Sequence, residues 1–67
     1  MITINHIPKS RGGLYVLKAT DPADFPALDL DVKRVYDSID PWASPFISRS
    51  IDESGAAIVK IKYYGLD

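Results

Sequence analysis

One stretch of the chain has a clear helical pattern. Its apolar residues recur at spacings of three and four over residues 28–39, which places them on one face of an α-helix. The residues of this stripe are Leu28, Val32, Val35, Tyr36 and Ile39. Asp40 and Pro41 follow, and proline disfavours the helical conformation of the residue before it. The sequence therefore predicts one helix that must bury this stripe against another part of the chain.

Four short segments have the alternation or the β-branched content of strands. They cover residues 2–7, 14–19, 46–51 and 56–64. Turn-forming residues at 8–13 separate the first pair, and an Asp-Glu-Ser-Gly loop at 52–55 separates the second pair, with Gly55 suited to a left-handed position. Two hairpins joined by one helix predict an α+β domain of order β-β-α-β-β. We expect a four-stranded antiparallel sheet with the helix on one face, which leaves the other face wet or available as an interface.

Two proline-containing segments, residues 20–26 and 42–45, are predicted to be connectors. Asp21 and Pro22 can begin one short helical turn in the first connector, with Asp21 as the N-cap. In the longer helix, Asp29 and Asp31 are expected in the first turn, where carboxylates interact well with the positive end of the helix dipole.

The length of 67 residues leaves room for a single domain, which we expect to span residues 1–67 and, because it begins with Met1, to be a complete small gene product. Its composition of 46% hydrophobic and 25% charged residues is that of a globular protein. Small domains have little core, and without cysteine this one has no disulfide to stabilise it. Good packing, self-association or docking onto another protein remain as sources of stability.

The residues needed for catalysis or metal binding are scarce. The chain has no cysteine and one histidine, His6, and its serines stand in no nucleophile-elbow pattern. We therefore expect no catalytic residues, no metal site and no cofactor, with His6 as a solvated or packing residue. No apolar run approaches the ~20 residues of a membrane span, and no signal peptide is recognisable. The sequence predicts a cytoplasmic protein that does not enter a membrane.

Acidic residues concentrate in the middle of the chain. Residues 21–40 contain six aspartates and two basic residues, a net charge of −4. Asp29, Asp31 and Asp37 are candidates for an acidic face that binds a basic partner. The alternative reading is that these aspartates cap the helix and keep it soluble.

Basic residues lie toward both ends. Lys9 and Arg11 flank a glycine-containing turn that could hold a phosphate or be an ordinary surface turn. Lys60, Lys62 and Tyr64 share one side of the last strand, as expected of a surface that binds single-stranded nucleic acid. A solvated strand face is the alternative for these three residues, and the net charge of −1 argues against a dedicated nucleic-acid binder.

Trp42 is a candidate aromatic anchor for a partner, and Phe46 shares this reading. The equal alternative for both residues is that they plug the end of the core. The leading hypothesis is a small non-enzymatic protein–protein interaction module. Its expected role is that of an inhibitor or regulator from a phage or mobile element, for example an anti-defence protein that blocks a nucleic-acid-guided host complex. The alternatives are a nucleic-acid-binding module and a homo-oligomer that pairs through its sheet.

Overall fold

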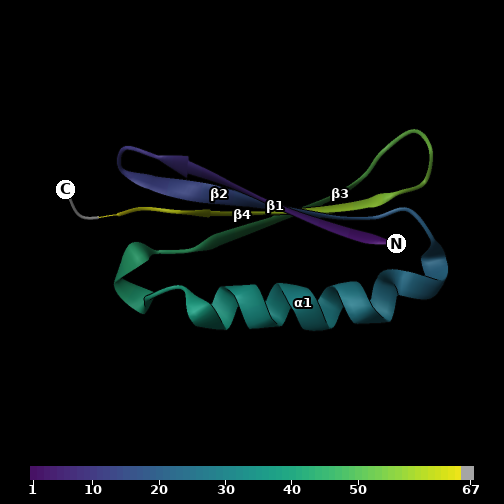
Figure 1. Ribbon diagram of the computed structural model, residues 1–67, viewed down its shortest axis with the longest axis horizontal. Coiled ribbons are helices and arrows are strands. Elements are labelled where there is room, and N and C mark those ends of the chain that lie inside the picture. The colour runs from purple at the N-terminus through teal and green to yellow at the C-terminus, as the bar shows by residue number, and fades with distance from the viewer. Residues whose placement is uncertain (66–67) are drawn as a thin grey trace.

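A twisted antiparallel sheet and one α-helix form the two layers of the structure (Figure 1). The computed structural model describes residues 1–65. Its strands are β1 (Ile2–Lys9), β2 (Gly12–Ala19), β3 (Phe46–Ile51) and β4 (Ala57–Tyr63), and the helix α1 (Phe25–Ser38) connects β2 to β3. The predicted α+β class with four antiparallel strands and one helix is confirmed.

The two hairpins meet through their second strands. The order across the sheet is β1-β2-β4-β3, so β2 and β4 are central while β1 and β3 are edges. Leu17 of β2 lies opposite Val59 of β4, and Tyr15 lies opposite Ile61. Because directly paired residues of antiparallel strands point to the same face, these four side chains all lie on the helix side of the sheet.

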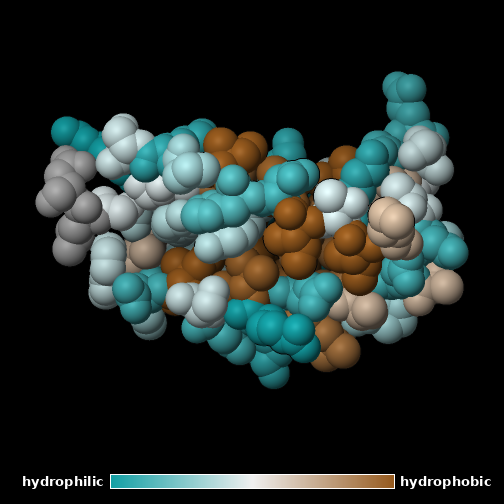
Figure 2. Space-filling model, viewed as in Figure 1, coloured by the Kyte–Doolittle hydropathy of each residue, from teal (hydrophilic) through white to brown (hydrophobic). Residues whose placement is uncertain are grey.

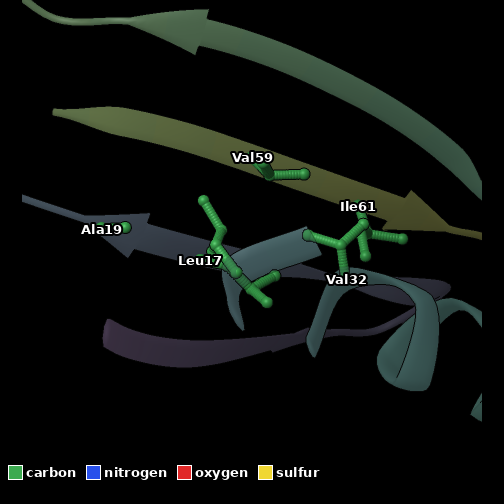
Figure 3. Packing of buried hydrophobic residues seen from close by; sticks show 6 residues of the cluster. Leu17, Ala19, Val32, Val59 and Ile61 are labelled. Atoms are coloured by element: carbon green, nitrogen blue, oxygen red, sulfur yellow. The ribbon is translucent and has the colours of Figure 1, made fainter. Parts of the chain in front are cut away.

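The core lies between α1 and the two central strands. Leu28 and Val32 of the helix pack with Leu17, Val59 and Ile61, and all five are buried. Figure 3 shows Leu17, Val59 and Ile61 on the sheet beside Val32 of the helix. In Figure 2 the hydrophobic atoms form a band between the sheet layer and the helix layer. The predicted apolar stripe of the helix therefore packs against β2 and β4, which correspond to the strands predicted at residues 14–19 and 56–64.

The helix begins three residues before the predicted start. A single turn of 3-10 helix, η1 (Pro22–Asp24), leads into α1, and the Asp21 carboxylate accepts a hydrogen bond from the Ala23 N–H at 3.0 Å. The predicted cap at Asp21 is confirmed. Pro26 lies in the first turn of α1, where proline is tolerated because its missing N–H has no partner there.

This earlier start moves two aspartates away from the helix N-terminus. The first turn of α1 has no acidic residue, so the expected interaction of Asp29 and Asp31 with the positive end of the dipole is wrong. Tyr36, predicted in the apolar stripe, is exposed at its edge. The helix ends at Ser38, and Ile39 has the extended backbone that precedes Asp40 and Pro41. The second connector contains another 3-10 turn, η2 (Pro41–Ala43).

The β1–β2 hairpin is tighter than the sequence predicts, because its strands leave only Ser10 and Arg11 in the turn. Gly12 continues from that turn with φ of 122°, a conformation that favours glycine. A Cβ atom at Gly12 would lie 2.1 Å from the carbonyl oxygen of Tyr63 on β4. The close approach of the backbones therefore requires glycine at this position.

The β3–β4 loop is organised by the Asp52 carboxylate. Its Oδ1 accepts hydrogen bonds from the N–H groups of Ser54 and Ala56 and from the Ser54 hydroxyl, at 2.9, 3.0 and 2.7 Å. These bonds favour the charged form, and they hold the pKa of Asp52 below its usual 3.8, with the Ser54 hydroxyl as the largest contribution and Lys18 as a smaller one. Gly55 has φ of 88°, which confirms its predicted left-handed conformation.

Truncation of Leu28 to alanine should destabilise the protein strongly. Leu28 is 2% exposed, whereas Leu30, two residues away on the same helix, is 64% exposed. We expect Leu28→Ala to lower the free energy of unfolding by ~2–4 kcal/mol, because it leaves a cavity in the core. Leu30→Ala should change it by less than ~0.5 kcal/mol. Urea denaturation of both variants measures the difference, and equal losses would contradict the described packing.

Asp52 should make folding stability dependent on pH in the acid range. Because its pKa is lower in the folded state, its stabilising contribution is present above the unfolded pKa and is lost as the pH falls through the folded pKa. Between pH 5 and pH 2, Asp52→Asn should therefore lose less stability than the wild type. Thermal unfolding across this range tests the difference, with Glu53→Gln as the control that keeps the wild-type slope.

Candidate interaction site: the open face of the sheet

The sheet face opposite α1 is covered by no element of residues 1–65 (Figure 1). The strand register arranges its side chains in three rows that cross all four strands. From β1 to β3 the rows are Ile7, Leu14, Lys62 and Phe46; Asn5, Val16, Lys60 and Ser48; and Thr3, Lys18, Ile58 and Ser50. We call these twelve residues the open face.

The open face combines apolar residues with positive charge. Leu14, Val16 and Ile58 are half-buried on the central strands, where neighbouring side chains shield them in part. The rows contain three lysines and no carboxylate. Lys18 has an ion pair with Asp52 at 3.6 Å, whereas no carboxylate of residues 1–65 lies within ion-pair distance of Lys60 or Lys62. The centre of the face is therefore positively charged.

The predicted basic and aromatic residues gather at one end of this face. Lys60 and Lys62 occupy adjacent rows, and the Lys62 ammonium lies 5.5 Å from the centre of the Tyr64 ring. Lys9, at the end of β1, has the same orientation as the other odd-numbered residues of that strand and so extends the face. Arg11 lies in the hairpin turn, next to this end of the sheet.

The predicted acidic residues lie on the other layer, on α1, and two of the three have basic partners. Asp29 forms an ion pair with Arg49 of β3 at 3.0 Å, and Asp31 is 3.6 Å from Arg34. Asp37 is exposed near the end of the helix. The three residues therefore do not form one uncompensated acidic patch. The Asp29–Arg49 pair instead connects the helix to an edge strand.

Trp42 is 57% exposed in η2, so it does not plug the core. The reading of this residue as a seal for the core is wrong, and its role as an anchor for a partner remains a hypothesis. Phe46, predicted together with Trp42 as an anchor or a plug, is 66% exposed at the edge of the open face. The alternation of residues 46–51 would have placed Phe46 beside Ser48 and Ser50, but the neighbouring lysines become evident only from the register.

A cluster of aromatic rings on the helix side of the sheet was missed. The rings of His6 and Tyr15, paired across β1 and β2, stack with a centroid distance of 4.2 Å and an interplanar angle of 4°. His6 Nε2 and the Tyr63 hydroxyl share a hydrogen bond of 2.6 Å. Burial raises the pKa of Tyr63, with a further contribution from Tyr15, so the phenol remains neutral at physiological pH. His6 therefore connects the first strand to the last instead of being solvated alone.

Gly13 explains how the Tyr63 ring reaches this position. A Cβ atom at Gly13 would lie 2.4 Å from the Tyr63 hydroxyl oxygen, so the ring occupies the space that a side chain would need. An aromatic ring packed over a glycine on the paired strand stabilises a position that would otherwise lack side-chain contacts.

Residues 1–65 contain no group of three or more His, Asp or Glu side chains arranged to hold a metal ion. No helix in the same range is long and apolar enough to cross a membrane. Comparisons with protein-family models, curated proteins and solved structures found no match to this chain.

Removal of the Tyr63 hydroxyl should weaken the aromatic cluster. We expect Tyr63→Phe to lower the free energy of unfolding by ~0.5–1.5 kcal/mol, the usual contribution of one hydrogen bond, and to shift the NMR signals of the His6 ring. Tyr64→Phe is the matched control, because the Tyr64 hydroxyl has no hydrogen bond within residues 1–65. If both variants behave alike, the His6–Tyr63 bond makes no measurable contribution.

Proposed function

We propose that this protein is a non-enzymatic binding module whose open face docks onto an acidic surface of a partner protein. The observation that carries the proposal is the sheet face on which Lys60 and Lys62 lie beside the half-buried Val16 and Leu14, with no carboxylate in its rows. Lysines that have no ion-pair partner within residues 1–65 attract an acidic surface and steer its approach. Aliphatic neighbours add contact area from which water is displaced.

The residue types on the central strands favour a protein over a single-stranded nucleic acid. Proteins that hold single strands on a sheet stack the bases on aromatic side chains. Here the central strands present Leu14, Val16 and Ile58 to the open face, and Phe46 stands on an edge strand. A mixture of aliphatic and cationic side chains is suited to a protein interface with a hydrophobic centre and complementary charge.

The lysines also disfavour a symmetric dimer through this face. Two copies packed face to face would bring Lys60 and Lys62 of both chains into one interface with no carboxylate from either set of rows. Like charges that meet in an interface cost several kcal/mol, at roughly 1 kcal/mol or more for each close pair. A different, acidic chain avoids this repulsion. Such a module would act on its partner by occupying a surface, as an inhibitor or regulator does.

Charge reversal on the open face tests the proposal. The variant Lys60→Glu/Lys62→Glu should lose the partner, because it replaces attraction with repulsion. The matched control Lys33→Glu/Arg34→Glu makes the same change in net charge on exposed positions of α1 and should keep the partner. Affinity capture from lysate of the source or host cells, followed by mass spectrometry, compares both with the wild type.

We expect a partner protein that both the wild type and the Lys33→Glu/Arg34→Glu variant retain after nuclease treatment. The Lys60→Glu/Lys62→Glu variant should lose this partner. A lower salt concentration should release the partner from either single lysine variant than from the wild type, because each variant removes one charge interaction. If the Lys60→Glu/Lys62→Glu variant retains the same proteins as the wild type, docking through the open face is refuted.

A nucleic-acid-binding module is the second candidate, because Lys9, Lys60, Lys62 and Tyr64 lie toward one end of the same face. In that case a fluorescent oligonucleotide should bind at low salt and should dissociate steeply as salt is added. The absence of binding at 20 mM salt, roughly where phosphate contacts are strongest, would exclude this candidate.

A further inference from the structure

A separate cavity lies on the helix side of the sheet, at the end of the molecule where α1 stops. It has a volume of about 190 Å³, and the ends of β2 and β4, the end of the helix and η2 form its walls. In Figure 1 these segments meet at the left, near the point where the described chain ends. Among the residues that line it are the aromatic Tyr15, Trp42 and Tyr63. Tyr64 also lines it, but its ring lies 5.5 Å from the Lys62 ammonium of the open face.

The electrostatic surroundings of this cavity are negative. Asp40 contributes a carboxylate to the lining, and no lysine or arginine of residues 1–65 lines it. Ser38 and Ile39, which also line it, are the last residue of α1 and its C-cap. The C-terminal end of a helix carries a partial negative charge of roughly half an elementary charge. The last turn of α1 has no basic residue to compensate that charge.

Several contacts hold the aromatic walls in place. The Tyr15 and Tyr63 rings have a centroid distance of 5.7 Å, and His6 fixes both by stacking on the first and hydrogen bonding to the second. The backbone N–H of Tyr64 donates to the carbonyl oxygen of Ala43 at 2.8 Å, which attaches η2 to the end of β4. Ser44, the C-cap that follows η2, has a left-handed backbone with φ of 52°. The walls are therefore formed before any ligand arrives.

We propose that this cavity binds a quaternary ammonium group. Aromatic residues around a cavity with one carboxylate are the arrangement that recognises choline and methylated lysine, because the faces of aromatic rings attract a cation that donates no hydrogen bonds. A hard metal ion would need six or more oxygen ligands, and residues 1–65 supply one carboxylate to the lining. The volume of about 190 Å³ is below the ~300–1,000 Å³ of pockets for drug-sized ligands, so it suits a head group.

The protein provides its own reporter for this site, because Trp42 is the single tryptophan of the chain and lines the cavity. Choline is the free ligand to titrate, and N-acetyl-trimethyllysine methylamide represents the same group on a polypeptide. The neutral molecule 3,3-dimethyl-1-butanol has the shape of choline without its charge. Both cations should change Trp42 fluorescence saturably, and the neutral molecule should bind ~10-fold more weakly or not at all.

Two variants make the test specific. Asp40→Asn should weaken the binding of choline ~3-fold to ~10-fold, because it removes the carboxylate that residues 1–65 contribute to the lining. The Asp40 side chain makes no capping hydrogen bond in η2, so this change should preserve the fold. Asp37→Asn removes the same charge from an exposed position of α1 that does not line the cavity, and it should leave the affinity unchanged.

Tighter binding of choline than of trimethyllysine would point to a free ligand, and the reverse would point to a methylated protein. The proposal is overturned if the neutral molecule binds as tightly as choline, or if neither cation gives a saturable change. Equal weakening by Asp40→Asn and Asp37→Asn would also overturn it, because the effect would then come from net charge alone.

Discussion

The burial of Leu28 and Val32 against β2 and β4 holds the two layers together, and the dimensions of these layers determine what remains uncovered. Four strands at ~4.8 Å spacing make a sheet about 19 Å wide, whereas a helix with its side chains is roughly 10 Å across. One helix can therefore cover the two central strands but only part of each edge strand, where Ile2 and Ile47 pack against the core. This mismatch leaves Arg49 and Ile51 of β3 exposed on the helix side. The opposite face has no second layer within residues 1–65, because the only α-helix there lies on the other side.

The two proposed sites occupy the areas that the helix does not reach. The open face has lysines among aliphatic residues, and the proposed function assigns to it an acidic surface of a partner. The cavity of Tyr15, Trp42 and Tyr63 lies beyond the C-terminal end of α1, where the sheet continues past the helix. These sites face different sides of the sheet and attract ligands of opposite charge. Under the two proposals, the same chain would bind an acidic partner on one side and a cation on the other.

Much of the fold could be predicted from local patterns. The alternation of residues 57–63 placed Ala57, Val59 and Ile61 on one side and Lys60 with Lys62 on the other, and the structure confirms this division. Helix boundaries were harder, because a proline near a helix start looks the same in sequence as a proline that excludes a helix. Asp29 was assigned to the helix dipole for this reason, whereas it pairs with Arg49, 20 residues away.

The sequence by itself determined the number and type of elements and which side chains share a face, because periodicity is a property of neighbouring residues. Only the tertiary structure decided that His6 meets Tyr63, which is 57 positions away, and that Lys60 lies between Val16 and Ser48. Strand order and register produce these neighbours. The order and register themselves result from the best joint burial of the helix stripe and the two hairpins. That optimum depends on the whole chain, so no local sequence pattern predicts it.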